Sequence, residues 1–164
     1  MSPDDAHRPK SPRASLTLLG LELPPVSRPK GAYVPAVRSG NLVFVAGQVP
    51  MKDGELTEIG QVGREVTTER ARELSRQCAL AALAAVDSVC GIDSVTRIVK
   101  VVGYVSSAPG FTGQPGVVDG ASEFFVEVFG DAGRHARSAI GVADLPLGAP
   151  VEIEVVAEVV DGAG

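Results

Sequence analysis

Residues 135–160 read HARSAIGVADLPLGAPVEIEVVAEVV and contain two β-rich runs, 137–142 and 151–160. In the second run the apolar Val151, Ile153 and Val155 alternate with Glu152 and Glu154. This period of two is typical of a strand that lays one face against a core. A loop rich in Pro and Gly separates the two runs, so both predict closing strands of a sheet.

Further elements precede this pair of strands. Runs 33–38 and 42–46 are rich in β-formers, and Ser39-Gly40-Asn41 between them predicts a hairpin. The β-branched run 95–105 predicts another strand. Apolar residues at helical spacing predict one helix from Thr67 or Thr68 to about Val89, and a second over 116–129 that ends at Gly130. The resulting order, ββαβαββ, predicts an α+β fold.

The face of the sheet that the helices leave uncovered suggests assembly. Two helices can cover only one face of such a sheet, yet Val156 adds an apolar side chain on the other side of the last strand. Apolar surface left open in this way favours a partner subunit. We therefore expect a homo-oligomer.

The chain of 164 residues and 16.9 kDa has the length of one domain. Residues 1–30 predict a flexible tail, a short helix that starts at Ser11-Pro12, and an extended connector, and residues 31–164 predict the α+β domain. No apolar run approaches the ~20 residues of a membrane span, and the N-terminus lacks a signal-peptide core. A cytoplasmic protein without a membrane partner is expected.

The net charge of the chain and its content of metal-ligating residues limit the partners and cofactors that it could bind. Residues 31–164 carry 10 basic and 17 acidic side chains, a balance of −7, which opposes binding to nucleic acid. The chain has two histidines and no CxxC or HxxxH motif, so neither a metal nor another cofactor is expected.

Several side chains could carry chemistry. Arg137 begins a strand of small, apolar residues, where an arginine serves either a structural ion pair with a neighbouring strand or the binding of a planar anion such as a carboxylate. Glu152 shares one strand face with Glu154, which by itself favours an ordinary polar face over catalysis. His135 is expected to be a solvated loop histidine, and without a histidine near Ser122 or Ser138 a catalytic triad is not expected.

The ordered combination of motifs resembles the Rid (YjgF) family of enamine/imine deaminases. It comprises residues 135–142, Leu145-Pro146 and 151–154, together with GAYV at 31–34, NLVFVAGQVP at 41–50 and GQVG at 60–63. The resemblance covers about residues 30–160. Residues 104–111 and 129–133 resemble a divergent branch of that family rather than its well-studied deaminases.

The resemblance implies a chorismate-mutase-like sheet with two helices on one face, assembled as a homotrimer with clefts between subunits. It also implies hydrolysis of 2-enamine or 2-imino acids to 2-keto acids and ammonia. In that family the arginine at the position of Arg137 binds the substrate carboxylate, and the glutamate at the position of Glu152 positions the attacking water. Tyr33, Ala46, Gly47 and the backbone N–H of Ala139 would line the cleft.

Two departures from the family pattern keep other functions open. Ala46 stands where the well-studied deaminases have serine, and Pro109 stands where they have asparagine. A trimer that binds small carboxylates without turnover, as a sensor or partner-binding module, is the main alternative. The endoribonuclease or translation-inhibitor role also attached to the family is the second, and the charge of −7 opposes it.

Overall fold

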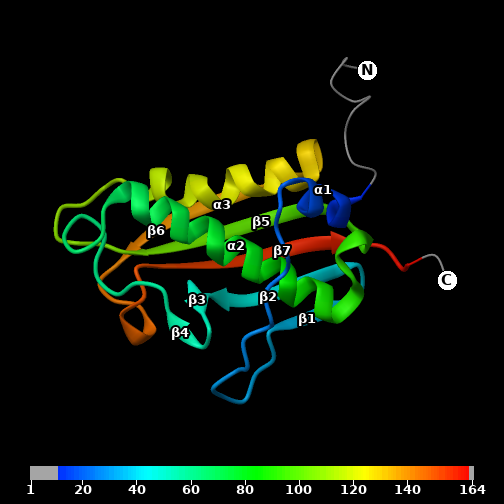
Figure 1. Ribbon diagram of the computed structural model, residues 1–164, viewed down its shortest axis with the longest axis horizontal. Helices are drawn as coiled ribbons and strands as arrows, with labels where there is room; N and C mark the ends of the chain where they lie inside the picture. The colour runs from blue at the N-terminus through cyan, green and yellow to red at the C-terminus, as the bar shows by residue number, and fades with distance from the viewer. Residues whose placement is uncertain (1–10, 163–164) are drawn as a thin grey trace.

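One mixed sheet organises the computed structural model, which describes residues 11–162. Its strands, in spatial order, are β1 (Ala36–Ser39), β2 (Leu42–Gln48), β7 (Val151–Val159), β5 (Val95–Ser106) and β6 (Ala136–Val142). Neighbours are antiparallel except β5 and β6, which run parallel and are connected through α3 (Gln114–Phe129). Figure 1 shows β7, the last strand of the chain, lying between β2 and β5. The predicted order ββαβαββ is confirmed.

A short hairpin was not predicted as strands. It pairs β3 (Met51–Lys52) with β4 (Glu55–Leu56) outside the main sheet. Asp53 and Gly54 form its turn with φ of 54° and 85°. A hairpin of this kind needs two left-handed residues in succession, and Asp-Gly is a preferred pair for them. The sequence therefore marks the turn, although strands of two residues are too short to show alternation.

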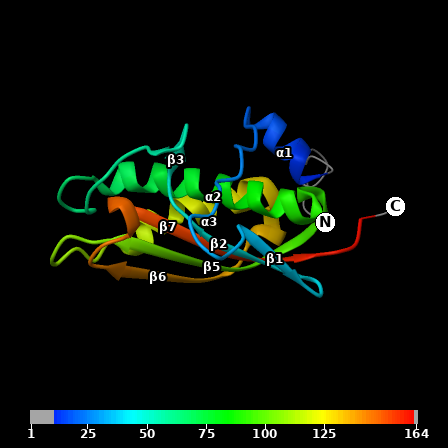
Figure 2. The ribbon, with the colours of Figure 1, turned by 90° about the horizontal axis from the view of Figure 1, so that it is seen from below.

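Helices α2 (Thr68–Cys90) and α3 lie on the same face of the sheet (Figure 2). The side chain of Thr67 accepts a hydrogen bond from the backbone N–H of Arg70, so the predicted cap is confirmed. Large buried side chains of the two helices pack against Ile98 and Ile153 of the sheet and form the core with them. These helix residues are Leu74, Leu83, Phe124 and Phe125. The prediction of two helices on one sheet face is confirmed.

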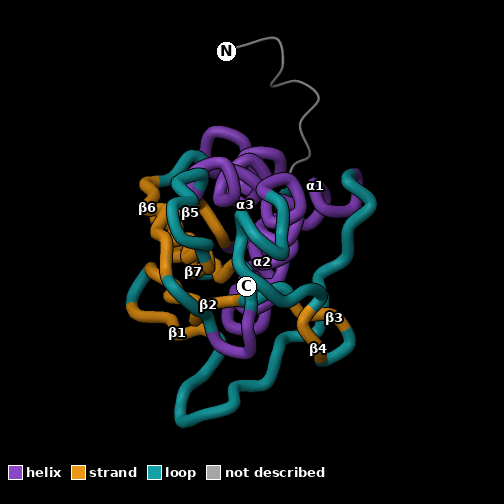
Figure 3. Tube along the Cα trace, turned by 90° about the vertical axis from the view of Figure 1, so that its left-hand side faces the viewer, coloured by secondary structure: helices purple, strands orange, loops and turns teal. Residues whose placement is uncertain are grey.

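A third helix, α1 (Pro12–Leu18), begins after Ser11, whose side chain accepts from the backbone N–H of Ala14. It lies on the outer side of the helical layer, away from the sheet (Figure 3). Leu16 is 2% exposed and joins the core, and Arg13 forms an ion pair with Asp87 of α2. The short helix is confirmed, whereas residues 1–10 of the expected flexible tail lie outside the described residues.

The opposite face of the sheet has no helix over it among residues 11–162 (Figure 2). Phe44 of β2 pairs with Val37 of β1 on one side and with Val156 of β7 on the other, so the three side chains form one row across this face. Val37, Phe44 and Ile140 of this face are 50%, 46% and 42% exposed. This open face is the apolar surface that the sequence predicts to be left over.

Within residues 11–162, no helix combines the length and the apolar character that a membrane crossing requires.

Candidate functional site

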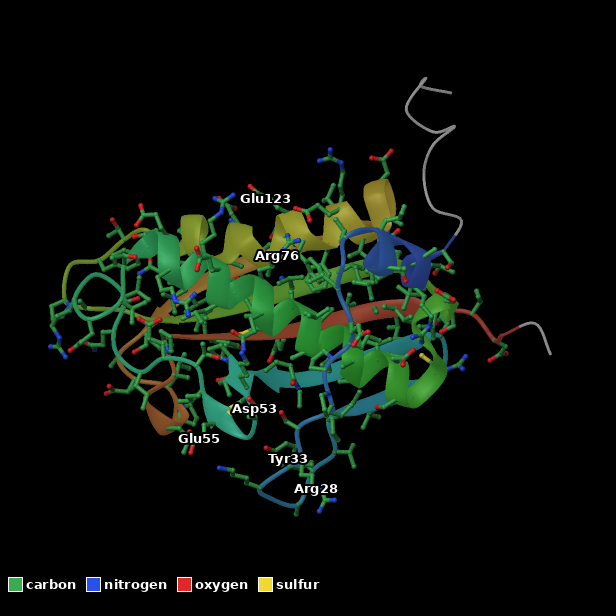
Figure 4. The ribbon with its side chains drawn as sticks, in the orientation of Figure 1. Arg28, Tyr33, Asp53, Glu55, Arg76 and Glu123 are labelled. Atoms are coloured by element: carbon green, nitrogen blue, oxygen red, sulfur yellow. The ribbon has the colours of Figure 1, made fainter. Side chains whose placement is uncertain are left out.

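A cavity of about 290 Å³ collects four of the six predicted site residues: Tyr33, Ala46, Gly47 and Glu152. Ala46 and Gly47 come from the end of β2, and Glu152 comes from the start of β7. Tyr33 lies on the loop before β1 and is 58% exposed. Figure 4 shows this loop, with Arg28 and Tyr33, projecting from the side of the molecule opposite α3.

The carboxylate of Glu152 lies directly over the backbone of Gly47. A Cβ added to Gly47 would lie 1.8 Å from Oε1 of Glu152, so only glycine permits this arrangement. No described residue donates a hydrogen bond to this carboxylate, which leaves its oxygens free for a ligand or a water molecule.

The surroundings of Glu152 make it more basic than an ordinary glutamate. Burial, and then the negative charge of Glu154 two residues along the strand, raise its pKa above 4.5. Tyr104 of β5, which pairs with Glu152, has a raised pKa because of burial and the charges of Glu154 and Glu152. A carboxylate disfavoured as an anion in this way can take up a proton from a bound water molecule.

Sequence reasoning missed other residues of this cavity. Arg28 and Lys30 line it from the loop before Tyr33, and Leu147 lines it from the loop before β7. Leu147 has φ 62° and ψ 8°, a left-handed conformation that costs a branched residue roughly 1–2 kcal/mol. Nothing in the side-chain pattern of residues 145–148 identifies this strain, because the residue in the left-handed position is not a glycine.

The other predicted catalytic residue, Arg137, lies elsewhere on the chain. Its Nη1 donates to Oδ1 of Asp119 at 2.7 Å and to Oγ of Ser122 at 3.2 Å, both on α3. Arg137 thus forms an ion pair, but its partner lies on helix α3 and not on a neighbouring strand as the sequence suggests. Ala139 lies two residues further along β6 and points to the same face.

Strand register separates Arg137 from Glu152. Arg137 pairs with Val101 of β5, whereas Glu152 pairs with Tyr104 of the same strand. Residues three apart on a strand point to opposite faces, so the two side chains leave the sheet on opposite sides. A single chain therefore does not bring the predicted anchor and the predicted water-positioning residue together.

The expectation of a solvated His135 is wrong. Its ring is half-buried, lies edge-on against Phe125 with ring centroids 5.8 Å apart, and hydrogen-bonds to Gly133 and Ser122. The statement that Ser122 has no histidine nearby is wrong as well, since Nε2 of His135 lies 3.0 Å from its Oγ. The 3-10 turn over Gly130–Gly133 reverses the chain and returns His135 beneath α3, which residue types alone do not reveal.

Among residues 11–162, no three His, Cys, Asp or Glu side chains gather to hold a metal ion. Cys78 and Cys90 are both free thiols.

Comparison with known proteins identifies the family. The family model described as Endoribonuclease L-PSP matches residues 25–159. Protein TCP17 of Trypanosoma cruzi is 40% identical over 147 residues, which cover 88% of this chain and 92% of that protein. A 2-iminobutanoate/2-iminopropanoate deaminase of Dermatophagoides farinae is 32% identical over 134 residues, covering 82% of this chain and 91% of that one.

The fold agrees with this match. A crystal structure of a putative endoribonuclease from Shewanella oneidensis superimposes with a TM-score of 0.88 at 31% identity, covering 92% of this chain and 100% of that one. The family model spans the whole sheet with α2 and α3, and includes both Glu152 and Arg137. The chain therefore belongs to the Endoribonuclease L-PSP family, which is the Rid (YjgF) family.

Proposed function

We propose that this protein hydrolyses 2-imino acids and their 2-enamine tautomers to 2-keto acids and ammonia. The observation that carries the proposal is Glu152, an unpartnered half-buried carboxylate with a raised pKa, fixed over Gly47 in a cavity that Tyr33 also lines. The deaminase from Dermatophagoides farinae, a relative over most of the chain, supports the same reaction class.

Glu152 would act as a general base. It holds a water molecule and takes one of its protons while the water oxygen forms a bond to the imine carbon. The electron pair of the C=N π bond passes to nitrogen, which takes the proton back from Glu152 and gives a carbinolamine with C–OH and C–NH2 groups. Glu152 then transfers the hydroxyl proton to the amino group, so ammonia leaves as the C=O bond forms and no metal, oxidant or reductant is required.

Arg137 would bind the substrate carboxylate, and this requires a second chain. Since Arg137 and Glu152 leave the sheet on opposite sides, a site that uses both combines Glu152 of one subunit with Arg137 of another. The open face with Val37, Phe44 and Ile140 offers apolar surface for such an assembly. We propose a homotrimer, so light scattering should give about three times 16.9 kDa, and a monomer at micromolar concentration would contradict it.

The direct test is ammonia release from 2-imino acids that an amino-acid oxidase generates in the reaction mixture. The protein should accelerate release, and Glu152→Gln should abolish the acceleration while sparing the binding of a 2-keto acid. Glu158→Gln is a matched control, because it removes a carboxylate from the same face of β7 six residues away. Equal rates for wild type and Glu152→Gln would overturn the assignment.

Non-catalytic binding of small carboxylates is the alternative, and Ala46 favours it because it provides no hydroxyl to the cavity. Such a protein would bind 2-keto acids and leave imine hydrolysis at the spontaneous rate.

Endoribonuclease activity is named in the family description, but the net charge of −7 over residues 31–164 opposes RNA binding. RNA cleavage that survives further ion-exchange purification and falls in Arg137→Lys would favour that role.

The proposal also includes a location in the cytoplasm. The cytoplasm is a reducing compartment, and the two free thiols of the protein suit it.

A further inference from the structure

Four side chains form a connected cluster between α3 and β6: Asp119, Ser122, His135 and Arg137. We call it the α3–β6 cluster. A surface hollow of about 680 Å³ opens over it, on the helix side of the sheet. The cluster contains Arg137, but its serine and histidine have no role in the proposed reaction.

The hydrogen bonds of the cluster have defined directions. The carbonyl oxygen of Gly133 can only accept, so Nδ1 of His135, 2.6 Å away, carries the proton. In the neutral ring Nε2 is then an acceptor, and the hydroxyl of Ser122, 3.0 Å away, donates a hydrogen bond to it. The lone pairs of the Ser122 oxygen are left to accept from Nη1 of Arg137.

These contacts orient the guanidinium group. Asp119 and Ser122 both accept from Nη1, and no described residue accepts from Nε or Nη2 of Arg137. Nε–H and one Nη2–H lie in the guanidinium plane along the same edge and form the fork that binds a carboxylate through two parallel hydrogen bonds. The engaged Nη1 thus leaves a complete fork available.

We infer that Ser122 and His135 are positioning residues for Arg137, holding Nη1 so that the Nε–Nη2 fork faces the substrate carboxylate, and that protonation of His135 weakens this hold. The inference rests on the proposed function, because it takes Arg137 as the carboxylate anchor.

A protonated His135 would reverse one bond of the cluster. Its Nε2–H would donate to Ser122, whose oxygen would then face two cationic donors, and the repulsion between His135 and Arg137 would disturb the position of Arg137. Burial, and then the charge of Arg137, lower the pKa of His135 below 6.5, although the bond to Gly133 opposes the shift. His135 is therefore neutral at pH 7 and becomes charged as the pH falls through a value below 6.5.

Other charged groups face His135 from three elements. From α3 these are Asp119, Glu123 and Glu127, from β6 Arg137, and from the turn before His135 Asp131 and Arg134. The acidic members are all ion-paired, with Arg137, Arg72, Arg76 and Arg134 as partners.

The test is calorimetric titration of the full chain with 2-oxobutanoate, a 2-keto acid, between pH 5 and 8. Wild type should bind with constant affinity above about pH 6.5 and lose affinity as the pH falls through the lowered pKa of His135. His135→Gln cannot be protonated, so the loss of affinity at low pH should be absent from it; protonation of Glu152, whose pKa is raised, would only favour the binding of an anion. Ser122→Ala should weaken binding about three- to tenfold at pH 7.5, the effect of one hydrogen bond, and Ser122→Thr should restore it.

Arg134→Gln is the control, because the Arg134 side chain lines the same hollow and is 72% exposed, but it forms its ion pair with Asp131 and not with the cluster. It should keep the wild-type pH profile. An unchanged pH step in His135→Gln, or wild-type affinity in Ser122→Ala, would overturn the inference and leave the proposed function standing. No binding of 2-oxobutanoate by wild type at any pH would overturn the anchor role of Arg137, and the inference with it.

Discussion

At the residue scale, Gly47 determines where Glu152 lies. The sequence identifies both residues through the family resemblance, but not their dependence on each other, because they come from different strands. The atom that a Gly47 side chain would meet is the end of a flexible carboxylate, so the fold can accommodate a methyl group if Glu152 moves. Function should therefore be far more sensitive than stability at this position.

Gly47→Ala tests this dependence. We expect imine hydrolysis to fall about 10²-fold or more, the contribution of a positioned general base, with little change in melting temperature. Gly116→Ala is the control, since the nearest atom to its new Cβ would be Cγ2 of Thr68 at 3.9 Å, and it should retain activity. Full activity in Gly47→Ala would mean that the observed position of Glu152 is not needed.

Glu152 itself should reduce the stability of the folded protein at neutral pH. A folded-state pKa raised above 4.5 gives stability that is complete below pH 4.5 and is lost as the pH rises through the raised value. Glu152→Gln is neutral at every pH, so it should melt at a higher temperature than wild type at pH 7 and at the same temperature near pH 4. Thermal denaturation followed by circular dichroism checks this, and a lower melting temperature for Glu152→Gln at pH 7 would contradict it.

At the scale of elements, periodicity was sufficient for the strands of the main sheet and the two long helices, but not for the short strands β3 and β4 or for the contacts between elements. The predicted strand 95–105 corresponds to β5, Val95–Ser106, and the helix predicted over 116–129 corresponds to α3, Gln114–Phe129. Apolar residues that recur every two residues in a strand, or every 3.6 residues in a helix, can be recognised in the sequence itself. The contact of His135 with Ser122 depends on the path of a loop, which no such repeat encodes.

The packing of α2 against α3 depends on a close approach of the two helix backbones at Gly120. A Cβ on Gly120 would lie 2.0 Å from the carbonyl oxygen of Arg72, a backbone atom that cannot rotate away. We expect Gly120→Ala to destabilise the protein by about 1–3 kcal/mol, the cost typical of overpacking. Gly116→Ala, four residues earlier in α3, should instead stabilise it by about 0.5–1 kcal/mol through lower chain entropy. Denaturant unfolding compares the two, and equal effects would show that the helices can separate at little cost.

At the scale of the whole molecule, one asymmetry links assembly to function. Both long helices cover one face of the sheet, so the other face keeps its exposed apolar side chains, and Arg137 and Glu152 lie on opposite sides. The sequence predicts the open face, because two amphipathic helices cannot cover two faces. It does not predict that the six candidate site residues fall into two groups, which follows from strand order and register.

This separation predicts that two inactive variants should restore activity to each other. In a ring of three identical interfaces, each site would take Arg137 from one chain and Glu152 from its neighbour. When Arg137→Gln and Glu152→Gln chains are unfolded, mixed in equal amounts and refolded together, a site is intact only if its first chain retains Arg137 and its second retains Glu152. Random assembly meets both conditions in about a quarter of sites, so ammonia release should recover to roughly a quarter of the wild-type rate. Each variant refolded alone, and the two mixed after separate refolding, should stay inactive. A refolded mixture no more active than its parents would mean that activity needs Arg137 and Glu152 in the same chain, and it would overturn a site shared between two chains.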